Sequence, residues 1–238
     1  MEDKLETELY KLLDSYSLFE FLSNEDNKDL VTDLIKLLPS SINQVEEFHT
    51  AFNCENKQTI ITVKTDTDVK LVNLRIGLIV EELTELICCF DEPVLLDAIS
   101  LLSKSISTIR NAWNKIDDGV ELVIDQREIL DALCDLQYVL DGTKLSFGYG
   151  DIFDEAFAAV HKSNMSKLCI DHEDAEVTVM HYDKLGIETF IEPTHLNKHT
   201  VRYIVKRKSD NKVLKSINYV PVFNDLQCIV DIKNNRTI

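Results

Sequence analysis

Two groups of carboxylates at helical spacing are the residues best suited to chemistry. Each group contains three acids within an apolar stretch, and together they are Glu81, Glu82, Glu85, Glu128, Asp131 and Asp135. Spacings of three and four residues place side chains on one face of a helix. Acids gathered in this way repel one another, and a hard divalent cation with oxygen ligands removes that cost. The pattern therefore predicts a site for Mg²⁺, with Mn²⁺ as an alternative.

A solvated helix face is the competing interpretation, since runs of charge commonly face water. Two features favour a site over that interpretation. Both groups interrupt apolar helical patterns, and Arg127 is the only basic residue between residues 120 and 140. A binding or regulatory module without catalysis, in which the acids form only a solvated surface, stays open as a hypothesis of another class.

The composition limits the partners. The 238 residues contain 25 Lys and Arg against 42 Asp and Glu, a net charge of −17, so we expect no binding to nucleic acid. No apolar run is long enough to cross a membrane, and Met1–Lys4 does not begin a signal peptide. Six cysteines without a CxxC pair predict a reducing, cytoplasmic compartment.

Apolar periodicity predicts a mainly α protein, an antiparallel helical bundle with a small C-terminal β appendage. The N-terminal 53 residues have the pattern of helix, break, helix, with leucines at helical spacing before Pro39. Longer helices are expected over 69–90, 93–116, 120–147 and 152–165. Runs of β-branched and aromatic residues at 177–182 and 200–206 predict two antiparallel strands.

Five segments carry a resemblance to a known family. The segment from Glu128 to Thr143 resembles the signature helix of the all-α nucleoside triphosphate pyrophosphohydrolases, in particular the MazG-like and phosphoribosyl-ATP pyrophosphohydrolase-like branch. Similar segments precede and follow it in the family's order: Glu47–Phe52 (EFHTAF), Arg75–Glu85 (RIGLIVEELTE), Val160–Leu168 (VHKSNMSKL) and Lys212–Pro221 (KVLKSINYVP). The gap between Glu85 and Glu128 is longer than the family pattern.

The resemblance implies Mg²⁺-dependent cleavage of a (d)NTP into a monophosphate and pyrophosphate, in a homodimer or homotetramer. Phosphoribosyl-ATP is the alternative substrate. Four acids would hold the metal, namely Glu82, Glu85, Glu128 and Asp131. Either Glu81 or Asp135 would deprotonate the attacking water. Residues expected to contact the nucleotide are Lys162, Asn164, Lys167 and His49.

The resemblance also divides the chain into four segments. They are an N-terminal helical extension (1–45), the pyrophosphohydrolase-like core (46–168), a β-rich insertion (169–209) and a tail (210–238). We expect the insertion and tail to fold over the nucleotide pocket, so that Lys212 or Lys215 meets the phosphates. On this expectation, a chain ending at Leu168 keeps a folded bundle.

Overall fold

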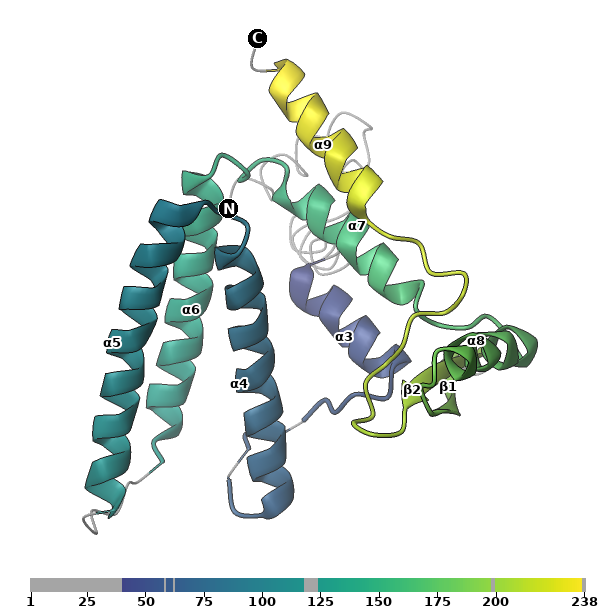
Figure 1. Ribbon diagram of the computed structural model, residues 1–238, viewed down its shortest axis with the longest axis horizontal. Coiled ribbons are helices and arrows are strands. Elements are labelled where there is room, and N and C mark those ends of the chain that lie inside the picture. The colour runs from purple at the N-terminus through teal and green to yellow at the C-terminus, as the bar shows by residue number, and fades with distance from the viewer. Residues whose placement is uncertain (1–39, 58, 62, 118–123, 198–199, 237–238) are drawn as a thin grey trace, which may run out of the picture. The chain divides into compact units, whose positions relative to one another are not determined.

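The computed structural model describes residues 40–57, 59–61, 63–117, 124–197 and 200–236. Within these ranges the protein is mainly helical with one antiparallel two-stranded sheet, which confirms the expected fold class (Figure 1). The helices expected before Pro39 lie outside the described residues. The elements are α3 (Ser41–Ala51), α4 (Asp66–Ile87), α5 (Glu92–Asp117), α6 (Gln126–Ser146), α7 (Phe153–Met165), α8 (His172–Lys184), β1 (Thr189–Asn197), β2 (Thr200–Arg207) and α9 (Phe223–Arg236).

The chain forms two compact units. One contains residues 57–142, and the other joins the residues up to Asn56 with those from Thr143 onward. The first unit therefore holds α4, α5 and most of α6, whereas the second holds the remaining helices and the sheet. The four-segment division inferred from the sequence stays a prediction.

Local signals set the helix ends in residues 57–142. Thr65 caps α4, because its hydroxyl accepts a hydrogen bond from the Asp68 backbone N–H while the Asp68 carboxylate accepts from Thr65. The Asp125 carboxylate accepts from the Arg127 backbone N–H at 2.8 Å where α6 begins. These helices have no core of their own, since no described residue between 57 and 142 is buried.

The second unit has a compact core around the hairpin. β1 and β2 pair antiparallel, with Thr189 opposite Arg207. Ile204 on β2 packs in one cluster with Ala51, Phe52 and Leu168, so that the ends of α3 and α7 meet the sheet. A second buried cluster contains Cys169, Ala175 and Val205. Residues from the expected insertion thus form one core with residues from the expected bundle.

The strand expected at 177–182 is wrong, because these residues lie in α8. The Asp171 side chain caps this helix by accepting from the Asp174 backbone N–H at 2.8 Å. Ala175 and Thr178 are buried one turn apart. Capping and helical burial thus outweigh the β propensity of the sequence. The strand that pairs with β2 is β1, and helix α9 occupies about half of what the sequence suggested as a tail.

Candidate functional site

The six acids lie on the two expected helices. Glu81, Glu82 and Glu85 are on α4, and their three counterparts are on α6. All six are exposed. Among the described residues, no group of three or more His, Cys, Asp or Glu side chains is close enough to hold a metal ion.

The donor types, but not their described positions, suit magnesium. Carboxylate oxygens are the ligands that Mg²⁺ prefers, and the i,i+3 pair Glu82 and Glu85 offers two on one helix face. The described arrangement does not unite this pair with Glu128 and Asp131. The magnesium site therefore stays a prediction, and no chemical step is derived through it.

Two of the residues expected to bind the nucleotide lie side by side at the end of α7. The Lys167 ammonium group donates to the Asn164 side-chain oxygen at 2.7 Å. Its nitrogen also lies 5.9 Å from the centre of the Phe48 ring, which stacks on Phe52 at 4.2 Å between ring centroids. Both polar side chains are half-buried. A fixed cation beside an amide and a stacked aromatic pair can contact both a phosphate and a base.

His49 lies on the neighbouring helix α3 and is buried. Its Nδ1 is 2.8 Å from the Asn56 side-chain oxygen, so this imidazole nitrogen is engaged within the protein. The position suits an imidazole that helps to shape the end of α3. A direct contact with nucleotide stays a prediction.

The remaining lysines predicted to contact phosphates are exposed. Lys162 lies in the last turn of α7, and the Lys215 ammonium group lies 4.4 Å from the centre of the Tyr219 ring. The Lys212 backbone N–H donates to Asp210, a carboxylate that also pairs with Arg207. The hydrogen bonds from Arg207 lower the pKa of Asp210 to about 2. Much of the positive charge near this turn is thus offset locally.

A polar cluster that the sequence did not indicate joins α3 to the hairpin. Asn53, in the left-handed region at φ 52°, donates from its amide to the Glu192 carboxylate and to the Pro193 carbonyl. The other Glu192 oxygen accepts from Lys206 at 2.8 Å, and the buried Thr194 hydroxyl donates to Asn53. An asparagine just after a helix is a local signal for a left-handed cap. No local pattern indicates a partner 139 residues away.

The ionisation of Glu192 follows from these contacts. Partial burial alone would raise the pKa of its carboxyl group, but hydrogen bonds from Lys206 and Asn53 outweigh it. The pKa of Glu192 therefore lies below its ordinary value of 4.5. The charged form holds the hairpin against the end of α3.

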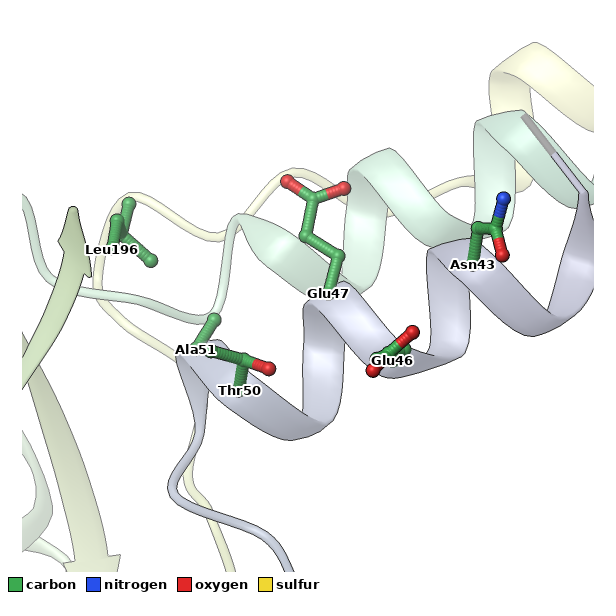
Figure 2. A pocket seen from close by; sticks show the side chains of 6 residues that line it. All are labelled: Asn43, Glu46, Glu47, Thr50, Ala51 and Leu196. Atoms are coloured by element: carbon green, nitrogen blue, oxygen red, sulfur yellow. The ribbon is translucent and has the colours of Figure 1, made fainter. Parts of the chain in front are cut away.

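A cavity of about 300 Å³ lies beside α3 (Figure 2). Side chains of α3 line it together with Leu196 near the end of β1; the α3 residues are Asn43, Glu46, Glu47, Thr50 and Ala51. Glu47 also pairs with His161 of α7 at 3.1 Å. None of the residues predicted to contact phosphate lines this cavity, and its two carboxylates disfavour a polyphosphate.

Comparisons with known proteins support the fold. No family model matches the chain. An uncharacterised protein of Acanthamoeba polyphaga mimivirus is 32% identical over 133 residues, a match that spans 53% of this chain and 53%, about half, of the viral protein. The chain is also similar to a crystal structure from Exiguobacterium sp. 255-15, described as a candidate NTP pyrophosphohydrolase. That likeness has a TM-score of 0.53 and 18% identity, and it covers 84% of this chain and 99% of the other. It shows a shared fold.

A helix that spans a membrane must be both long and predominantly apolar. None of the helices that the structure describes is both long enough and apolar enough to cross a bilayer.

Proposed function

We propose that this protein is a nucleoside triphosphate pyrophosphohydrolase that cleaves a (d)NTP into a monophosphate and pyrophosphate. The observation that carries the proposal is the likeness of fold over 84% of the chain to a candidate NTP pyrophosphohydrolase. Two sets of acids on α4 and α6, in segments that resemble the MazG-like branch, add independent support. Fold alone does not determine function, so the acids carry the chemical part of the argument.

The acids would act with a divalent cation, Mg²⁺ or Mn²⁺. Glu82 and Glu85 on α4, with Glu128 and Asp131 on α6, are the proposed ligands, and binding would require the two helices to come together. The cation would offset the charge of the polyphosphate, which a protein at −17 otherwise repels. A carboxylate that does not bind the metal, Glu81 or Asp135, would deprotonate the attacking water.

The end of α7 would contact the nucleotide. Lys167 and Asn164 are already held together by their hydrogen bond, so binding would cost less conformational entropy than ordering two free side chains. Lys162 in the last helical turn and Lys212 and Lys215 in the tail would add positive charge near the phosphates. We further propose that the active form is a homodimer or homotetramer in the cytoplasm.

The test is identification of the products. The full chain is incubated with Mg²⁺ and a panel of canonical and damaged (d)NTPs together with phosphoribosyl-ATP, and the products are separated by anion-exchange chromatography. We expect a nucleoside monophosphate and pyrophosphate in equal amounts. Preferred cleavage of phosphoribosyl-ATP would instead assign the protein the activity of a phosphoribosyl-ATP pyrophosphohydrolase. Release of orthophosphate, or no turnover with any substrate, would contradict the proposal.

A further inference from the structure

Residues 215–220 form an irregular segment in which every residue is hydrogen-bonded to a helix, and we call this segment the strap. It leads from the hairpin to α9, and Figure 1 shows the chain passing the C-terminal end of α7 on this path. Helix α8 holds the first four residues of the strap, through Tyr182 at Lys215, Thr178 at Ile217, and Asp174 at both Ser216 and Asn218. The strap is therefore fixed although it is neither helix nor strand.

Two serines of α7 and its C-cap hold the last two residues of the strap. The buried Ser163 hydroxyl donates to the Val220 carbonyl at 2.7 Å, and its oxygen lies 3.1 Å from the Tyr219 hydroxyl oxygen. The Ser166 hydroxyl accepts from the Val220 backbone N–H at 2.9 Å. The two segments that contain these residues both resemble the pyrophosphohydrolases, and here they form one structural unit.

The strap sets the position of the Lys215 ammonium group. This group lies 4.4 Å from the centre of the Tyr219 ring, at the distance of a cation–π contact. Because the Tyr219 hydroxyl is held at Ser163, the ammonium group lies within about 10 Å of the Ser163 hydroxyl. Lys162 and Asn164 flank Ser163 on α7. The strap thus brings a lysine of the tail close to the end of α7.

Lys162 and Lys215 differ from the other basic residues of this region in their charge partners. Each of the three basic residues 206–208 pairs with a carboxylate. Lys212 lies beside Asp210, to which its backbone N–H donates. No carboxylate of the described residues forms an ion pair with Lys162 or Lys215. Their positive charge therefore remains available to an anionic ligand.

The α7 side chains beside the strap offer hydrogen-bond donors. The Asn164 side-chain oxygen accepts from Lys167 at 2.7 Å, so the amide offers its N–H groups to a ligand. Lysine ammonium groups are donors only. The Glu47 carboxylate, which reaches α7 from α3, is paired with His161 at 3.1 Å. Phosphate oxygens, which accept hydrogen bonds and carry negative charge, match this set of donors.

From this geometry we infer that the strap and the end of α7 form a phosphate-binding site in which Tyr219 positions Lys215. Lys215, Lys162 and Asn164 contact the phosphate oxygens, whereas Tyr219 acts through Lys215 and does not touch the ligand. The inference rests on the proposed function in taking the ligand to be the polyphosphate of a nucleotide. It selects Lys215 over Lys212, which the sequence left as alternatives.

Binding of inorganic tripolyphosphate to the full chain tests this site without requiring turnover. Isothermal titration calorimetry in the presence of Mg²⁺ compares the wild type with Lys215→Ala and Lys212→Ala, which remove the same charge from two exposed positions of the tail. We expect Lys215→Ala to weaken binding about fivefold to tenfold and to make it less sensitive to salt, because one phosphate contact is lost. Lys212→Ala should change the affinity by less than about twofold. Equal losses in the two variants, or a wild type that does not bind tripolyphosphate, would overturn the inference.

A double-mutant cycle tests the positioning role of Tyr219. Tyr219→Leu should weaken tripolyphosphate binding about as much as Lys215→Ala does. Because Tyr219 acts through Lys215, the double variant should bind no more weakly than Lys215→Ala alone. Circular dichroism and thermal melting check that each variant is folded. Tyr219→Phe takes the place of Tyr219→Leu if the latter does not fold, and its loss should likewise vanish when Lys215 is absent. Losses that add in the double variant would show that Tyr219 does not act through Lys215.

Tripolyphosphate binding and nucleotide cleavage together separate this inference from the proposed function. A chain that cleaves (d)NTPs while Lys215→Ala keeps the wild-type affinity for tripolyphosphate would overturn the inference alone. A chain that binds tripolyphosphate as expected but cleaves no (d)NTP would support the phosphate-binding site and contradict the proposed function.

Discussion

Asp174 illustrates how single polar residues hold the hairpin unit together. This buried carboxylate accepts from the Ile170 backbone N–H at 3.0 Å and from the Asn218 amide at 2.9 Å. Asp174→Ala should lower the free energy of unfolding by about 2 kcal/mol, because it leaves these two donors and the buried Ser216 hydroxyl without their acceptor. Asp183→Ala, at an exposed position of the same helix, should change it by less than about 0.5 kcal/mol. Urea denaturation measures both, and equal values would contradict the assigned role.

Glu192 gives a prediction about pH. Its folded-state pKa lies below 4.5, so its ionised form stabilises the folded protein at neutral pH. This contribution is present above pH 4.5 and is lost as the pH falls through the lower, folded-state pKa. The melting temperature of Glu192→Gln should therefore lie below that of the wild type at pH 7, with the gap closing below pH 4.5. A gap that widens in acid would contradict this account.

Two residues compete for the role of general base. Replacing the true base with its amide should lower kcat by about 10²–10⁴-fold. Glu81→Gln and Asp135→Asn should therefore differ, with the large loss confined to one of them and little change in substrate KM. Steady-state kinetics on the substrate found in the product panel measures this. Full activity in both variants would exclude both residues from the role.

At the scale of elements, the sequence predicted what depends on local signals. The periodicity of 93–116 and the proline at 93 correspond closely to α5, and the acids fall on α4 and α6 as expected. The β-branched run 177–182 led to a wrong strand prediction, because the Asp171 cap and the burial of Ala175 favour a helix. The hydrogen bond between Asn53 and Glu192 could not be predicted from the sequence, because it arises from tertiary packing between distant segments.

The hairpin is part of a core rather than a detachable appendage. Ile204 is fully buried beside Ala51, Phe52 and Leu168. A chain ending at Leu168 would lose this contact, so we now expect truncation to remove the packing of α3 and α7 on the hairpin and to destabilise them, contrary to the expectation from sequence. Ile204→Ala in the full chain should cost about 2–5 kcal/mol. Val201→Ala on the exposed side of β2 should cost less than about 1 kcal/mol.

At the scale of the whole molecule, net charge opposes self-association. Residues 57–142 contain eight Lys and Arg against sixteen Asp and Glu, so two copies of this unit repel each other. Added salt screens such repulsion. The dimer dissociation constant should therefore fall as NaCl rises from about 0.05 to 0.5 M, as analytical ultracentrifugation can measure. A dissociation constant that rises with salt would point to attractive ion pairs at the interface.

The acids are the part of the proposed function that one measurement can test most directly. Pyrophosphate release by the full chain is followed with and without Mg²⁺ for the wild type, Asp131→Asn and Asp141→Asn. Both variants remove one exposed acid from α6, but only Asp131 is a proposed ligand. We expect Mg²⁺-dependent turnover in the wild type and in Asp141→Asn, and a loss of at least a hundredfold in Asp131→Asn. Turnover that needs no divalent cation, or that survives in Asp131→Asn, would contradict the account.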